Sequence, residues 1–109
     1  MKLGILGPKN LKNALFYKYL TDEVCELVTG DTGEIYSVAK ELSFLRGLKH
    51  TVFSEFHTTI ENKSAFSTYE AITDYSDEII VFYDGRLGDM LSVIEYVKRV
   101  KKKLMIIFY

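Results

Sequence analysis

The alternation of apolar and polar positions along the chain predicts five strands separated by helices. Short runs rich in Val, Ile, Leu, Phe and Tyr occur at 2–6, 24–29, 51–56, 78–83 and 103–109. The stretches between these runs are long enough for helical crossovers, which join parallel strands. The pattern therefore predicts an α/β fold, a three-layer sandwich with a five-stranded parallel sheet in the order 3-2-1-4-5 and right-handed crossovers.

Apolar residues at helical spacing predict helices over 10–20, 34–46, 65–75 and 89–103. The last has the most regular pattern, with one apolar stripe from Met90 to Val100. The second stops at Gly47, which can adopt the left-handed conformation that ends helices. The polar segment between 57 and 64, which contains His57, is interpreted as a loop.

Three large apolar residues lie opposite the apolar stripes of the first two predicted helices. They are Phe16 and Leu20 on the first and Phe44 on the second. A monomer would leave these groups in water. We therefore expect a symmetric homodimer formed through the outer faces of these two helices.

Length and composition indicate a single soluble domain over 1–109. The chain has 109 residues, 48% of them hydrophobic and 27% charged, with a net charge of −1. This charge gives no global electrostatic argument for nucleic-acid binding. The first residues enter a strand directly and no apolar run is long enough for a membrane span, so we expect a cytoplasmic protein. The single Cys25 lies in an apolar run and is interpreted as a buried, reduced thiol, and no metal or cofactor site is predicted.

Glycine-bearing loops follow the first, second and fourth predicted strands. The carboxyl ends of parallel strands share one edge of the sheet, where ligands of such folds bind. Each loop alone could be a structural turn, but five glycines in three loops at one edge favour a ligand crevice. The predicted ligand-binding residues are Gly7, Pro8, Lys9, Thr29, Gly30, Asp31, Thr32, Gly33, Asp84, Gly85, Arg86, Gly88 and Asp89.

The charges in and beside these loops are mostly negative. Asp31, Glu34, Asp84 and Asp89 outnumber Lys9 and Arg86. Such a site would repel a highly phosphorylated group, whereas ribose hydroxyls or an exocyclic amine would suit the carboxylates. The segment Gly4–Gly7 lacks the third glycine of a dinucleotide fingerprint, so a classical NAD site is not predicted.

The three loops and the strand before the last one resemble the SLOG superfamily, the Rossmann-like group that contains the DprA and LOG proteins. The resemblance covers nearly the whole chain and is strongest to the small YspA-like members. It is carried by Gly7, by the loop 29–33 and above all by the stretch 76–85, in which an aromatic residue precedes Asp84-Gly85. It implies a nucleotide or nucleoside-derived ligand, bound by a sensor or sequestering protein in defence or phage conflict.

The chain also departs from the family pattern. Asp31 stands where the second loop usually has a glycine, Tyr36 where an acidic residue is typical, and Thr68-Tyr69 where an Arg-Asn pair is typical. Ser92 replaces the catalytic glutamate of LOG phosphoribohydrolases. The loss of that glutamate argues against LOG-type cleavage, so no catalytic residue is assigned.

Two alternative functions stay open from the sequence. The first is an N-glycoside hydrolase or transferase, similar to LOG proteins or nucleoside deoxyribosyltransferases, that would use a carboxylate from Asp31, Asp84, Asp89 or Glu95. The second is a protein-interaction module in which the glycine loops are only turns.

Overall fold

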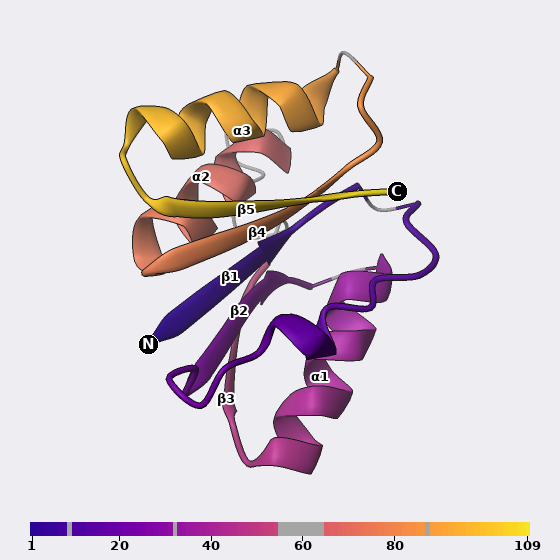
Figure 1. Cartoon of the computed structure of the whole chain (residues 1–109), viewed down its shortest axis with the longest axis vertical. Coiled ribbons are helices and arrows are strands. Elements are labelled where there is room, and N and C mark those ends of the chain that lie inside the picture. Colours follow the sequence, from indigo (N-terminus) through magenta and orange to yellow (C-terminus); the bar gives the residue numbers. More distant parts are fainter. Residues whose placement is uncertain (9, 32, 55–64, 87) are drawn as a thin grey trace.

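The strands form one parallel sheet in the order β3-β2-β1-β4-β5, as predicted (Figure 1). The computed structural model describes residues 1–8, 10–31, 33–54, 65–86 and 88–109, without the side chains of 65–67. The strands are β1 (Lys2–Leu6), β2 (Glu26–Gly30), β3 (Lys49–Phe53), β4 (Glu78–Tyr83) and β5 (Lys103–Phe108). The helices are α1 (Gly33–Arg46), α2 (Ala65–Tyr75) and α3 (Asp89–Arg99), with a single 3-10 turn at Tyr17–Tyr19. The predicted loop at 57–64, with His57, lies outside the described residues.

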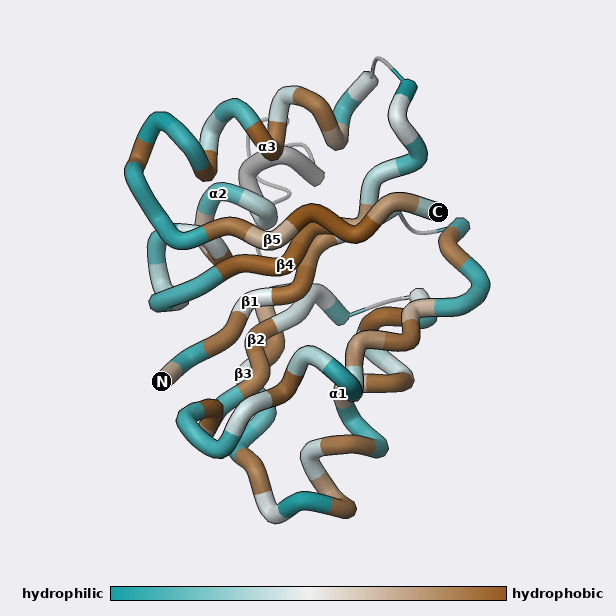
Figure 2. Tube along the Cα trace, viewed as in Figure 1, coloured by the Kyte–Doolittle hydropathy of each residue, from teal (hydrophilic) through white to brown (hydrophobic). Residues whose placement is uncertain are grey.

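Helices cover the two faces of the sheet unequally. Helices α2 and α3 pack together on one face, while α1 and the largely irregular segment 10–24 cover the other (Figure 1). Each face has its own hydrophobic core: Leu27 and Phe82 belong to the core under α1, and Val28 and Val81 to the core under α2 and α3. Figure 2 shows the hydrophobic residues concentrated along the central strands. Because adjacent strand residues point to opposite faces, both cores draw on the same apolar runs.

The helix boundaries follow local signals. The apolar stripe of α3 is buried as predicted, from Met90 to Val97. This helix ends at Arg99, earlier than the predicted 103, because Lys101 has a left-handed φ of 62° and turns the chain toward β5. Helix α1 ends before Gly47, whose φ of 67° confirms the predicted glycine stop.

The predicted first helix over 10–20 does not form. The buried residues of this segment are Leu11, Ala14 and Phe16, whereas Leu15 is 55% exposed. The Phe16 ring packs edge-on against Phe82 with centroids 6.5 Å apart. A regular helix would bury Leu15 and turn Phe16 to solvent, and burying the larger aromatic side chain stabilises the fold more.

The surface predicted for a homodimer is therefore not present. Phe16 is fully buried, and Leu20 is partly buried against the same core. Only Phe44 is exposed as predicted, at 87%. These three residues do not form one patch.

The environment of Cys25 also differs from the prediction. Strand β2 begins at Glu26 and not at 24, so Cys25 precedes the strand and is exposed. Its Sγ lies 3.1 Å from the amino-terminal nitrogen of Met1.

None of the helices found in the described segments combines the length and the apolar character needed to cross a membrane.

Candidate functional site

An open crevice lies at the carboxyl ends of β1 and β4, where the strand order reverses. These two strands are neighbours, and the chain proceeds outward from them in opposite directions, to β3 on one side and to β5 on the other. Reversals of this kind are where open α/β sheets bind ligands. The crevice has a volume of about 800 Å³. Its lining residues are Pro8, Asn10, Leu11, Lys12, Asn13, Tyr69, Tyr83, Asp84, Arg86, Gly88, Asp89, Met90 and Tyr109.

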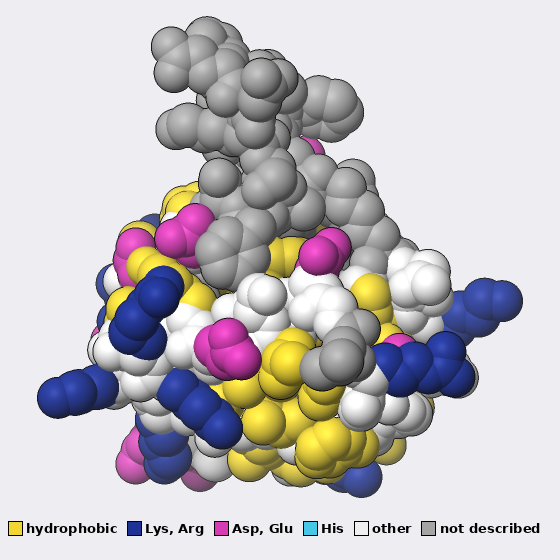
Figure 3. All heavy atoms as spheres, turned by 90° about the horizontal axis from the view of Figure 1, so that it is seen from above, with side chains coloured by type: hydrophobic (Ala, Val, Ile, Leu, Met, Phe, Trp, Pro, Cys, Tyr) yellow, Lys and Arg dark blue, Asp and Glu magenta, His cyan; other side chains and the backbone are white. Residues whose placement is uncertain are grey.

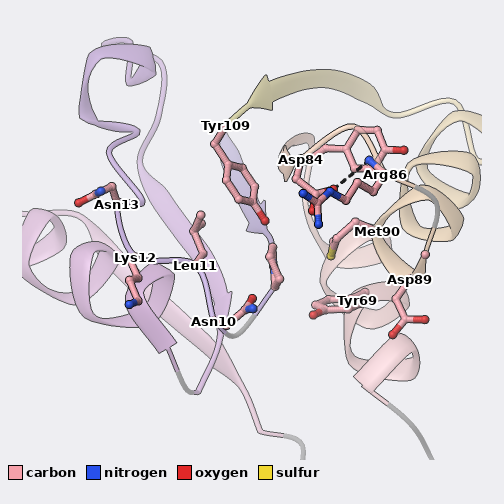
Figure 4. Close-up of a pocket in the computed structure, with 13 residues that line it drawn as sticks. Asn10, Leu11, Lys12, Asn13, Tyr69, Asp84, Arg86, Asp89, Met90 and Tyr109 are labelled. Atoms are coloured by element: carbon pink, nitrogen blue, oxygen red, sulfur yellow. Dashed lines mark hydrogen bonds between the residues drawn. The ribbon is translucent and has the colours of Figure 1, made fainter.

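The turn from β4 to α3 forms one side of the crevice (Figure 4). The carboxylate of Asp84 accepts a hydrogen bond from the backbone N–H of Arg86, with Oδ1 and N 2.9 Å apart. Gly85 and Gly88 have φ values of 85° and 151°, and a Cβ on either would meet no atom within 4 Å. These two glycines are therefore required by the backbone conformation of the turn and not by crowding.

The irregular segment after β1 forms the opposite side. The N–H of Leu11 bonds to the carbonyl of Pro8 at 3.2 Å, which turns the chain as it leaves the strand. Figure 4 shows Asn10, Leu11, Lys12 and Asn13 across the crevice from Asp84 and Arg86, with Tyr109 between the two sides. Of these four residues, Asn10 and Leu11 lie nearest the turn after β4, whereas the Asn13 side chain points away from it (Figure 4).

Three tyrosines line the crevice. Tyr69 comes from α2, Tyr83 from the end of β4 and Tyr109 from the residue after β5. Burial, and then the nearby carboxylate of Asp84, raise the pKa of the Tyr109 phenol, while the charge of Arg86 acts in the opposite direction. The Tyr109 phenol therefore stays protonated at neutral pH and can both donate and accept hydrogen bonds.

A second, much smaller cavity of about 30 Å³ lies beside the crevice. It is lined by Gly7 and Pro8 after β1, by Gly30 and Gly33 around the end of β2, and by α2 residues that include Thr68 and Tyr69. Thr68 is 3% exposed, and within the described part of the chain its Oγ1 has no hydrogen-bond partner. A cavity of this size has room for about one water molecule.

The predicted ligand-binding residues that the structure describes line one of two cavities, apart from Thr29, Asp31 and Gly85, which line neither. Those that line the crevice are Pro8, Asp84, Arg86, Gly88 and Asp89, and those that line the small cavity are Gly7, Pro8, Gly30 and Gly33. The loops after β1 and β4 thus share one crevice, whereas the loop after β2 contributes to the small cavity. Lys9 and Thr32 lie outside the described residues.

Three predicted residues have structural contacts, although the buried Oδ1 of Asp31 has no hydrogen-bond partner among the described residues. Thr29 is buried, and its Oγ1 lies 2.9 Å from Nε2 of His50 on β3. Asp31 accepts a hydrogen bond from the hydroxyl of Ser54 at 2.9 Å, which ties the end of β2 to the end of β3. A Cβ on Gly7 would lie 2.7 Å from Cδ1 of Ile35 and 3.2 Å from Cβ of Phe82, so close packing favours glycine there.

The lining residues absent from the prediction are the four from 10 to 13, the three tyrosines and Met90. The sequence pattern places the first four in a helix that does not form. Tyr83 and Met90 sit directly beside the predicted turn, at the end of one element and the start of the next. Their position next to the turn could have identified them as lining residues from the sequence, whereas no local pattern identifies Tyr69.

On the face seen in Figure 3, hydrophobic side chains gather in one area and most Lys and Arg side chains lie toward its two sides. The crevice itself has two carboxylates, Asp84 and Asp89, and two cationic groups, Lys12 and Arg86. Within the described ranges, no group of three or more His, Cys, Asp or Glu side chains is placed to hold a metal ion.

Comparison of the chain with protein-family models, with curated proteins and with solved structures gave no match.

Proposed function

We propose that this chain binds a nucleotide- or nucleoside-derived small ligand in the crevice between the β1 and β4 loops. The observation that carries the proposal is the crevice of about 800 Å³ at the reversal point of the sheet. Small-molecule sites typically have volumes of roughly 300–1,000 Å³, and this position is the usual one for ligands of open α/β sheets.

The lining chemistry supports a ligand with an aromatic base and hydroxyl groups. The rings of Tyr69, Tyr83 and Tyr109 offer flat apolar surface against which a base can pack. The carboxylates of Asp84 and Asp89 can accept hydrogen bonds from ribose hydroxyls or from an exocyclic amine. The amide of Asn10 can both donate and accept such bonds within the crevice.

The resemblance to SLOG proteins implies a sensor or sequestering role, and we keep that role as part of the proposal. In such a role the occupied crevice would alter how the chain interacts with another component. The sequence expectation of a cytoplasmic location fits this role and stays a prediction.

The proposal is tested by blocking the crevice without disturbing the core. Asn10→Trp places a large side chain at an exposed lining position, and Leu15→Trp places the same side chain at an exposed position of the same segment outside the crevice. Isothermal titration calorimetry with adenosine, guanosine, cytidine, uridine and their 5′-monophosphates should show saturable binding to the native protein. We expect Asn10→Trp to weaken that binding at least about tenfold and Leu15→Trp to leave it unchanged. Absence of binding by all eight compounds, or equal weakening by both variants, would contradict the proposal.

A further inference from the structure

We propose that the crevice prefers uncharged nucleosides over their phosphate esters, because the turn after β4 already carries carboxylates where a phosphate would bind. This inference rests on the proposed function and specifies the ligand class of the same site. It assigns the specificity to two side chains, Asp84 and Asp89.

Asp84 occupies an anion-binding position of its own turn. Phosphates in α/β proteins commonly bind the free backbone amides of the turn between a strand and the next helix. Here the Arg86 amide already donates to Oδ1 of Asp84 at 2.9 Å. The turn thus contains an internal carboxylate that uses one of the donors a phosphate would need.

Asp89 places a second carboxylate at the amino end of α3. It is the first residue of that helix, it is exposed, and it lines the crevice. A negative side chain in the first turn complements the helix dipole. The position that favours an anion is therefore already occupied by a carboxylate of the protein. The residue before the helix is Gly88, which has no side chain that could cap the helix.

The two cationic side chains of the crevice do not cancel the repulsion between these carboxylates and a phosphate. Arg86 lies beside Asp84, and Lys12 lies on the opposite side of the crevice (Figure 4). A phosphate at the start of α3 would lie beside Asp89, and a phosphate that used the amides of the turn would compete with Asp84, while Lys12 lies on the other side of the crevice. A neutral nucleoside meets no such repulsion, and its hydroxyls can donate to the same carboxylates.

The test compares dissociation constants of each nucleoside and its 5′-monophosphate by calorimetry at fixed ionic strength. The native protein should bind the preferred nucleoside about tenfold or more tightly than its monophosphate. The double variant Asp84→Asn, Asp89→Asn keeps both side-chain shapes, and the carboxamide oxygen that it introduces in the turn can still accept from the Arg86 amide. We expect this variant to reduce the preference for the nucleoside about tenfold. Asp22→Asn, an exposed aspartate outside the crevice, is the matched control and should keep the native ratio.

The possible outcomes separate this inference from the proposed function. A monophosphate that binds as tightly as its nucleoside, in a manner blocked by Asn10→Trp, would overturn the inference and leave the crevice as a binding site. An unchanged ratio in the double variant would show that the two carboxylates do not set the preference. No binding of any nucleoside or monophosphate would overturn both proposals.

Discussion

The hydroxyl of Tyr69 on α2 donates a hydrogen bond to the carbonyl of Gly7 in the turn after β1, with the two oxygens 3.1 Å apart. Tyr69 also lines both the crevice and the small cavity, as Pro8 does. This contact links a helix on one face of the sheet to the loop that begins the candidate site.

Tyr69→Phe should lower the free energy of unfolding by about 1 kcal/mol, because it removes this hydrogen bond while the ring stays in place. Urea denaturation monitored by circular dichroism measures the change. Tyr17→Phe, at a tyrosine that is 49% exposed, is the control and should change stability by less than about 0.5 kcal/mol. Equal effects of the two substitutions would show that the bond to Gly7 contributes nothing.

Thr68→Val should raise the free energy of unfolding by about 1 kcal/mol, because a buried hydroxyl without a partner is costly and valine has nearly the same shape. Thr73 is the matched control on the same helix. Its buried hydroxyl donates to the carbonyl of Tyr69 at 2.8 Å, so Thr73→Val should lower stability by about 1 kcal/mol. A Thr68→Val protein that is less stable than the native one would mean that the Thr68 hydroxyl has a partner, such as a bound water.

Glu26, at the start of β2, should make stability depend on acidity. Burial raises the pKa of this carboxyl, but hydrogen bonds from the hydroxyls of Thr51 and Tyr75, both at 2.6 Å, and the charges of Lys49 and Lys2 outweigh it. The pKa in the folded protein is therefore below its ordinary value. The ionised carboxylate stabilises the fold above the unfolded-state pKa of about 4.3, and this stabilisation is lost as the pH falls through the folded-state value.

Glu26→Gln should accordingly lower the free energy of unfolding by about 2 kcal/mol near pH 7, with a smaller difference from the native protein near pH 3. Denaturation curves at both pH values provide the measurement. Glu41→Gln, at an exposed position of α1, controls for the loss of one charge. A deficit that is equally large at both pH values would argue that shape, and not ionisation, explains the effect.

Phe16 and Phe44 test the corrected description of the β1–β2 connection. Phe16→Ala should lower the free energy of unfolding by about 3–5 kcal/mol, because it empties a fully buried site beside Phe82. Phe44→Ala should change it by less than about 0.5 kcal/mol, because that ring is 87% exposed. Thermal and urea denaturation of both variants distinguish this arrangement from one in which the two rings share an exposed face.

The strand order was predictable because the strong signals were local and mutually consistent. Two continuous apolar strands, a regular stripe in α3 and the helix stop at Gly47 all favour the same parallel sheet. Boundaries shifted by a few residues where turns intervened, as at Lys101.

The connection from β1 to β2 was not predictable in the same way. The spacing of its apolar residues in the sequence fits a helical stripe. In the structure, however, Phe16 is buried against Phe82, a residue far away in the sequence. Because this tertiary contact outweighs local periodicity, the crevice side formed by residues 10–13 could not be read from the pattern. Tyr69 was missed for a related reason, since its contact with Gly7 joins residues 62 positions apart.

The most direct test of the central claim is a two-dimensional ¹⁵N–¹H NMR titration with the four nucleosides. We expect the largest amide shift changes at residues 10–13 and at 84–86 and 88–90, on the two sides of the crevice. They should saturate together and be lost in Asn10→Trp. Shifts confined to α1 or to the end of β2, or no saturable shifts with any nucleoside, would contradict the assignment of this crevice as the binding site.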